Sequence, residues 1–340
     1  MILVTGGTGL LGSHLLYRLV QEHAEVIALK RPSSDLEEVR KVFGYYPPGE
    51  TAADALFERI RWVDANLLNQ VDVLEAMQGI GRVYHCAGIV SFQPRDRRKM
   101  LRFNAGSTAC VVQACLTEGV EKLLHVSSTS TIGRSTDKSP ATENLIWAKT
   151  KSSSAYSESK FRAEMEVWRG MEEGLNAVIV NPSIIFGPGF WERGSTSMFS
   201  RVAGGLRYAT PGITGYVGVQ DVVRAMTGLM DSELSGERYI VSEGNYSFRE
   251  IFSMISESMG ITRKMKPVSR GLLQSVARLD ALASVFRGKR AITSQNVHDA
   301  FNVTHFSSGK IREALGMEFT PLKQVLEEMA LHYLKEHPKK

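Results

Sequence analysis

The 340-residue sequence contains little cysteine and no long apolar run. Its three cysteines, Cys86, Cys110 and Cys115, are odd in number and lack the spacing of metal ligands. We therefore expect no structural disulfides, no bound metal and a reducing, cytoplasmic location. No apolar stretch approaches the length of a membrane span, and the first β-prone run begins at Ile2, ahead of any basic region. These absences predict a protein with no signal peptide and no membrane partner.

Charge of one sign is not concentrated anywhere either. The net charge is +5 and the isoelectric point is about 9.0, but the basic residues are scattered along the chain. A phosphate-bearing cofactor and a solvated surface explain this excess at least as well as a nucleic acid. We expect no nucleic-acid partner. The 43% of hydrophobic residues is typical of a globular protein with an ample core.

The most informative stretch is the first twelve residues, MILVTGGTGLLG. The apolar run Ile2 to Val4 predicts a strand, the glycines a tight turn, and the apolar pattern from Leu10 a helix. Unpaired N–H groups at such a helix start carry the positive end of the helix dipole and bind phosphate. We expect Gly6 to permit the turn, Gly9 to let a pyrophosphate approach the backbone, and Gly12 to let helix and strand pack closely.

Further strands alternate with helical patterns along the chain. The predicted strands are Glu25 to Leu29, Arg59 to Val63, Arg82 to Cys86, Lys122 to Val126, Ala177 to Asn181 and Arg238 to Val241. This alternation predicts an α/β fold of the Rossmann type, a doubly wound parallel sheet with a smaller, mostly helical C-terminal substrate lobe. We assign residues 1–181 to a dinucleotide-binding domain, to which 216–242 return, and residues 182–215 and 243–336 to the lobe. The seven glycines within 186–215 indicate loops over a pocket.

The end of the second strand bears on cofactor choice. An acidic residue there binds the ribose 2′-hydroxyl of NAD, whereas a basic residue favours the 2′-phosphate of NADP. This chain has Lys30 and Arg31 and no carboxylate before Asp35. NADP is therefore the expected cofactor and NAD the second choice. Ala87 and Gly88, after the fourth strand, are small enough for a flat ligand to lie against the backbone.

Tyr156 and Lys160 lie four residues apart at the start of a strong helical segment, so they project from the same face. A neighbouring ammonium favours the phenolate of a tyrosine, whose ordinary pKa is about 10. A phenol adjusted in this way can exchange a proton with a substrate oxygen. Ser128, at the end of the fifth strand, is placed to hold that oxygen. Asn104, an unfavourable residue inside the helix expected from about Arg97 to Gly119, either holds a water or faces solvent.

Taken together, these motifs resemble the extended short-chain dehydrogenase/reductase superfamily, also called the NAD-dependent epimerase/dehydratase family. The matching pieces, in order, are TGGTGLLG from Thr5, HCAG from His85, VSS from Val126, YSESK from Tyr156, NPS from Asn181 with Gly187-Pro188, and YVGVQDV from Tyr216. The resemblance implies that Tyr156 is the acid/base, that Lys160 holds the nicotinamide ribose and tunes Tyr156, and that Ser128 polarises the substrate. Ser127 and Thr129 remain alternatives to Ser128. The expected cofactor contacts are Gly6, Thr8, Gly9, Leu10, Gly12, Lys30, Arg31, Asn66, Leu67, Ala87, Gly88, Lys160, Pro182 and Ser183, with Asn66 standing where the family usually has an Asp.

Within the superfamily the sequence favours a reductase. Dehydratases carry an acidic pair after the serine, where this chain has Thr129 and Ser130. Nucleotide-sugar epimerases have an Asn three residues before the Gly-Pro, where this chain has Ile184. The pattern is closer to dihydroflavonol-reductase-like members, and we expect an NADP(H)-dependent oxidoreductase that interconverts a carbonyl and an alcohol on a small substrate. The alternatives are an NAD-dependent sugar or nucleotide-sugar epimerase and a non-catalytic dinucleotide-binding regulator. The resemblance also implies a homodimer through residues 97–118 and 156–173.

The stretch Arg270 to Arg290 is amphipathic and basic at both ends, with Leu272, Val276, Leu279, Ala283 and Phe286 along one stripe. Such a helix can lie on a membrane surface. A helix whose stripe faces the core or a pocket is the more frequent case, and it is what we expect here.

Overall fold

The computed structural model describes the chain from Met1 to Pro338, except for residues 48–49, 136, 138, 151–152 and 288–292. Its centre is a seven-stranded parallel sheet in the order β10-β6-β5-β4-β1-β2-β3. The strands are β1 (Ile2–Thr5), β2 (Val26–Lys30), β3 (Ile60–Asp64), β4 (Arg82–His85), β5 (Lys122–Val126), β6 (Ala177–Pro182) and β10 (Glu237–Val241). The strand order reverses between β1 and β4. In such sheets ligands bind in the crevice at this reversal, beyond the carboxyl ends of the strands.

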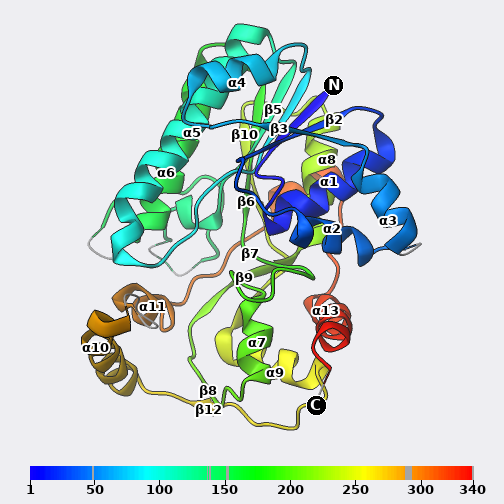
Figure 1. Cartoon of the computed structure of the whole chain (residues 1–340). Helices are drawn as coiled ribbons and strands as arrows, with labels where there is room; N and C mark the ends of the chain where they lie inside the picture. The colour runs from blue at the N-terminus through cyan, green and yellow to red at the C-terminus, as the bar shows by residue number, and fades with distance from the viewer. Residues whose placement is uncertain (48–49, 136, 138, 151–152, 288–292, 339–340) are drawn as a thin grey trace.

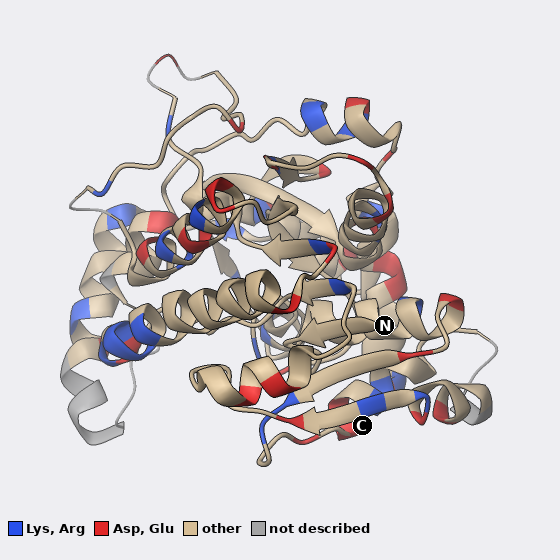
Figure 2. Cartoon of the chain, turned by 90° about the horizontal axis from the view of Figure 1, so that it is seen from above, with Lys and Arg blue, Asp and Glu red and all other residues tan. Residues whose placement is uncertain are grey.

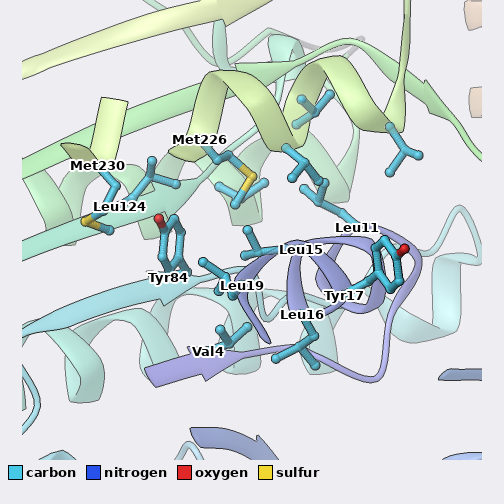
Figure 3. Close-up of a cluster of buried hydrophobic side chains, with 14 of the residues drawn as sticks. Val4, Leu11, Leu15, Leu16, Tyr17, Leu19, Tyr84, Leu124, Met226 and Met230 are labelled. Carbon is cyan, nitrogen blue, oxygen red and sulfur yellow. The ribbon is translucent and has the colours of Figure 1, made fainter. Parts of the chain in front are cut away.

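Helices cover both faces of the sheet, as Figure 1 shows. One face carries α4 (Gln70–Met77), α5 (Arg97–Glu118) and α6 (Ala155–Glu172). The other carries α1 (Leu10–Glu22), α2 (Glu37–Gly44), α3 (Glu50–Phe57) and α8 (Val219–Asp231). Two separate apolar cores result, one on each face. In Figure 3, Leu15 and Leu19 of α1, Tyr84 of β4 and Met226 of α8 meet in the first of these cores.

The sheet confirms the predicted Rossmann-type fold. Each predicted strand is present with ends shifted by at most one residue, because buried β-prone runs between glycine and polar turns leave little freedom in where a strand begins. The helix expected from about Arg97 to Gly119 is α5, and Gly119 ends it in the left-handed conformation at φ 66°. Short 3₁₀ turns, η1 (Pro94–Asp96) and η2 (Thr129–Thr131), follow β4 and β5.

Below the sheet, the remaining chain builds a lobe around a third apolar core. Its helices are α7 (Ser197–Ala203), α9 (Phe248–Ser258), α10 (Arg270–Arg287), α11 (Ser294–Asp299) and α13 (Leu322–Glu336), while α12 (Gly309–Leu315) lies against β10. Its short strands are β7 (Ile184–Phe186), β8 (Tyr208–Ala209), β9 (Ile213–Gly218), β11 (Gly244–Ser247) and β12 (Lys266–Pro267). The expectation of loops throughout 186–215 is wrong. Trp191, Phe199 and Val202 are buried there, and that burial stabilises α7 despite the glycines.

The expected orientation of α10 is also wrong. Leu272, Val276 and Leu279 do not face the core, since their exposed fractions are 55%, 42% and 67%. The side chains of Ala283 and Phe286 lie outside the described residues. Within the described chain, no helix is long and apolar enough to cross a bilayer. The three cysteines are free thiols.

Candidate active site

The glycine turn between β1 and α1 has the geometry of a phosphate cradle. Gly6 has φ 73°, which favours glycine, and the turn is closed by a 3.1 Å hydrogen bond from the Gly9 N–H to the Gly6 carbonyl. A Cβ on Gly12 would lie 2.2 Å from the Gly6 oxygen, so helix and turn touch as expected. No side chain caps the N-terminus of α1 and no acidic residue lies in its first turn. Its free N–H groups are therefore directed at the crevice, beside the half-buried Thr8, Gly9 and Leu10.

The two basic residues at the end of β2, Lys30 and Arg31, differ in their ion-pair partners. The Lys30 ammonium forms a 2.5 Å ion pair with Asp64, at the end of the neighbouring strand β3. Arg31 is exposed and makes no ion pair within the described part of the chain. Lys30 is therefore already partnered by a carboxylate, and Arg31 is the cation available to an anion here. The sequence did not reveal this difference, because Asp64 is 34 residues from Lys30.

The next two strand ends carry the remaining residues expected on the adenine and nicotinamide sides. After β3, Asn66 is exposed and its Oδ1 accepts a hydrogen bond from the Leu68 N–H, while Leu67 is buried. After β4, Ala87 is buried and Gly88 is exposed. A Cβ on Gly88 would lie 3.1 Å from the Lys160 ammonium, so the missing side chain leaves room beside that group.

Asn104 holds the loop after β4 in place. Its Oδ1 accepts a hydrogen bond from the Ile89 N–H at 2.7 Å, and its Nδ2 donates to the Ile89 carbonyl at 3.0 Å and to the Ser159 hydroxyl at 2.8 Å. The side chain is only 1% exposed. Asn104 therefore does not face solvent, which was one of the two sequence-based alternatives. Asn104 instead joins α5, α6 and the Gly88 loop, which explains an amide inside a helix.

Tyr156 and Ser128 meet at the carboxyl end of β5. The Ser128 hydroxyl lies close enough to the Tyr156 phenol to favour its ionised form, and the Phe92 ring lies 6.4 Å from the Tyr156 ring. Burial raises the pKa of Tyr156 above its usual value, and Ser128 only partly offsets this rise. Ser127 is turned the other way, since its hydroxyl donates to Glu164 at 2.6 Å. Of the neighbouring hydroxyls of Ser127 and Ser128, it is therefore that of Ser128 that lies against the phenol.

Lys160 is buried beneath this group. Its ammonium donates a hydrogen bond to the Val126 carbonyl at 2.7 Å, and the residue as a whole is only 4% exposed. Burial lowers its pKa to about 8, and the nearby Cys86 and Glu164 oppose that change. The expected lowering of the Tyr156 pKa by this ammonium is not present, because Lys160 is directed at the end of β5 instead.

A buried polar cluster, which sequence reasoning missed, fixes the segment that carries Ser128. Glu164 is 1% exposed, and its Oε2 accepts hydrogen bonds from Ser127, Thr131 and Asn181 at 2.6, 2.7 and 3.0 Å. Its Oε1 forms a 2.8 Å ion pair with Arg238 of β10. Glu164 lies one helical turn beyond Lys160, and this spacing from Tyr156 and Lys160 is the signal that could have identified it.

Pro182 ends β6 next to this cluster, and Ser183 follows it. Both are buried, and the Ser183 N–H and hydroxyl donate to the Val241 carbonyl at 3.1 and 3.4 Å. Every residue expected from the sequence to form the site thus lies at or just beyond a carboxyl strand end, on α1 or on α6. Such an edge can bind a dinucleotide along the glycine turn and present a proton-bearing phenol next to it.

Comparison with known proteins gives one family match and several relatives. The model of the "NAD dependent epimerase/dehydratase family" matches residues 2–242. A putative dihydroflavonol 4-reductase of Synechocystis is 28% identical, covering 98% of this chain and 94% of that protein. Sterol demethylase protein B of Methylococcus capsulatus is 28% identical over 82% of this chain and 80% of that protein. Tetraketide alpha-pyrone reductase 1 of Arabidopsis thaliana is 27% identical, covering 79% and 85%.

Solved structures share the fold. The crystal structure of gox2253 aligns with a TM-score of 0.80 and 24% identity, covering 99% of this chain and 98% of that one. DesIV from Streptomyces venezuelae, a dTDP-glucose 4,6-dehydratase determined with NAD bound, aligns with a TM-score of 0.75 and 19% identity over 99% and 98%.

Proposed function

Because the chain belongs to the NAD-dependent epimerase/dehydratase family, we propose that it is an NADP(H)-dependent oxidoreductase that interconverts a carbonyl and an alcohol on a small organic substrate. The chain is an enzyme of the NAD(P)-dependent extended short-chain dehydrogenase/reductase type. The observation that carries the proposal is the placement of Ser128 beside Tyr156, at the crevice of a Rossmann-type sheet.

The residues of the crevice fit a dinucleotide. A Cβ on Gly9 would have only the Gly6 oxygen as a neighbour, at 3.5 Å. This side of the turn is therefore open and can receive a diphosphate. The uncapped N–H groups of α1 supply its hydrogen bonds. Asn66 and Leu67 would flank the adenine, and Ala87, Gly88, Pro182 and Ser183 would border the nicotinamide half. Lys160 would hold the nicotinamide ribose beside Gly88.

A bound nicotinamide supplies the hydride or accepts it. In the direction of reduction, the Tyr156 hydroxyl donates its proton to the substrate oxygen as that oxygen gains charge, and the Ser128 hydroxyl holds the oxygen by a second hydrogen bond. The raised pKa of Tyr156 keeps the phenol protonated at neutral pH, which suits a proton donor. Glu164 acts on this chemistry only indirectly, since it fixes Ser127 and thereby the position of Ser128.

The preference for NADP over NAD rests on Arg31. Its guanidinium is free to meet a 2′-phosphate, and arginine binds phosphate through paired N–H groups. Lys30 supports the site less directly, because Asp64 already neutralises it.

The substrate is proposed to bind between the two parts of the chain, residues 1–181 with 216–242 holding the cofactor and residues 182–215 with 243–336 shaping the substrate pocket. The relatives are named for reductions of a dihydroflavonol and a tetraketide alpha-pyrone and for sterol demethylation. We propose an apolar carbonyl compound as the substrate class, because two of these names give a reductase and the third a sterol. The second candidate is a sugar or nucleotide-sugar epimerase, because a fold neighbour, UDP-glucose 4-epimerase of Thermotoga maritima, was solved with UDP-glucose.

We also propose that the enzyme pairs as a homodimer through α5 and α6. These two helices pack against one another along one face of the sheet, and Met165 of α6 is 47% exposed on their outer side.

The test is to identify any dinucleotide released from the purified protein and to follow NADPH and NADH consumption with aldehydes, ketones and nucleotide sugars. NADPH consumption with an apolar aldehyde or ketone is the expected result. Tightly retained NAD with interconversion of sugar epimers would replace the proposal by the second candidate, and dinucleotide binding without any turnover would indicate a regulator.

A further inference from the structure

The described part of α10 leaves an apolar face uncovered. Leu272, Val276 and Leu279 are spaced at helical intervals, and their exposed fractions of 55%, 42% and 67% place them in water. Arg270 and Arg278 are exposed on the same helix, and the Arg270 guanidinium lies over the Phe301 ring. A helix that exposes a continuous apolar side flanked by arginines is the type that lies in a bilayer interface.

A basic cluster lies at the N-terminus of α5. Arg95, Arg97, Arg98, Arg102 and Arg162 line a surface depression of about 550 Å³. Glu158 is shared by Arg97, Lys149 and Arg162, so one carboxylate offsets three cations. Arg98 and Arg102 make no ion pair with any described residue. The first turn of α5 contains no acidic residue, and the helix dipole adds to the positive potential there. Arg98 and Arg102 therefore add positive charge near the start of α5, and an anionic surface would neutralise it.

These two features lie at the same end of the molecule. Figure 1 places α10 and α11 below the N-terminal ends of α5 and α6, and Figure 2 shows one long helix whose end carries a group of Lys and Arg (blue). A second depression of about 230 Å³ lies between the basic cluster and α11, which packs against α10; its lining includes Arg97 of the cluster and Thr293 and Gln295 at the start of α11. Its lining also includes Phe92, whose ring lies 6.4 Å from the Tyr156 ring. Helix α10, the basic cluster and the approach to Tyr156 are therefore at the same end of the molecule.

We propose that this end of the molecule docks on the surface of a membrane that contains anionic lipids. The apolar face of α10 enters the interface, and Arg98 and Arg102 contact lipid phosphates. A nucleic acid or an acidic protein would account for the arginines, but it would leave the apolar face in water; an anionic bilayer accounts for both. This proposal revises the sequence-based expectation of no membrane partner. It concerns peripheral binding and does not depend on the proposed catalytic function, because binding is measured without substrate. It requires the proposed homodimer to leave Arg98 and Arg102, in the first two turns of α5, uncovered.

The first experiment measures co-sedimentation of the full chain with phosphatidylcholine vesicles containing or lacking about 30% phosphatidylglycerol. We expect binding only to the anionic vesicles. Arg98→Gln with Arg102→Gln should lower the partition coefficient about 30-fold, which is about 2 kcal/mol at about 1 kcal/mol for each basic residue. The matched control, Arg61→Gln with Arg249→Gln, removes two exposed arginines elsewhere and should bind as the unchanged chain. Equal loss in both double variants would overturn the proposal, since net charge alone would then explain binding.

The second experiment tests entry of α10 into the bilayer. A tryptophan introduced by Leu272→Trp should shift its fluorescence to the blue with anionic vesicles and be quenched by brominated acyl chains. Leu331→Trp, at a side chain 73% exposed on α13, is the control and should do neither. Leu272→Ser with Leu279→Ser should reduce vesicle binding at least tenfold, with an unchanged circular dichroism spectrum. A folded chain that fails to bind anionic vesicles, or a Leu272→Trp variant whose fluorescence does not change with them, would overturn the proposal. The proposal would also be overturned if inorganic phosphate displaced the protein from anionic vesicles more strongly than chloride at equal ionic strength. That result would indicate a site for a small anion.

Discussion

Two glycine substitutions, three residues apart, separate a role in folding from a role in cofactor binding. At Gly12 a Cβ would lie 2.2 Å from the Gly6 oxygen and 2.8 Å from the Gly7 Cα. Both contacts are with backbone, which cannot move without reshaping the turn. We expect Gly12→Ala to lower the free energy of unfolding by about 3 kcal/mol, at the upper end of typical overpacking costs.

Gly9→Ala should behave in the opposite way. A Cβ there meets only the Gly6 oxygen, at 3.5 Å, and the backbone at φ −104° and ψ 171° suits any residue. The loss of stability should stay below about 1 kcal/mol, as for a change at a helix N-cap. The new methyl group, however, occupies the side of the turn that is open to a diphosphate. We expect the Kd for NADPH to rise at least tenfold, or about 1.4 kcal/mol.

The assays are urea unfolding followed by circular dichroism and titration of NADPH fluorescence, with both variants and the unchanged chain measured together. A stable Gly9→Ala variant that binds NADPH like the unchanged chain would refute the assignment of the cradle. A Gly12→Ala variant of unchanged stability would refute the packing argument.

Three further outcomes follow from the same structure. Arg31→Ala should raise the KM for NADPH at least tenfold and leave that for NADH nearly unchanged, and an equal change for both cofactors in steady-state kinetics would contradict the role of Arg31. Glu164→Gln should cost about 3 kcal/mol in urea unfolding, because it breaks the ion pair of a buried carboxylate with Arg238; a loss below about 1 kcal/mol would contradict it. Burial lowers the pKa of His14 to about 4 and that of His85 to about 3. As the pH falls below about 6.5, these histidines therefore bind protons in the unfolded chain at a higher pH than in the folded chain. Stability should therefore fall between pH 6.5 and 4, by up to about 1.4 kcal/mol per pH unit for each histidine, and a flat profile in urea unfolding would contradict this account.

Sequence reasoning predicted the elements whose structure depends mainly on residues close to one another in the sequence. The β1 turn and α1 follow from a short apolar run, four glycines and a helical pattern, all within the first twenty residues. The parallel sheet follows from repeated alternation of strand and helix, and α6 from the spacing around Tyr156.

The parts that could not be predicted depend on contacts between distant segments. Glu164 meets Arg238 and Ser127 across 74 and 37 residues, and no local pattern announces such partners. Asp64 neutralises Lys30 only because β2 and β3 are adjacent in the sheet. The exposure of Leu272 was missed for a related reason. The amphipathic pattern of α10 shows that one face is apolar, but not whether another element covers it.

The account depends most on Tyr156 as the proton donor next to a bound dinucleotide. The decisive measurement compares Tyr156→Phe with the unchanged chain, in NADPH consumption with the substrate found by screening and in direct titration of NADPH. The phenyl ring keeps the packing against Phe92 and removes only the hydroxyl. We predict that kcat falls at least about 100-fold while the Kd for NADPH changes less than about twofold, in line with the usual contribution of general acid catalysis. Turnover by Tyr156→Phe at the rate of the unchanged chain would contradict the account.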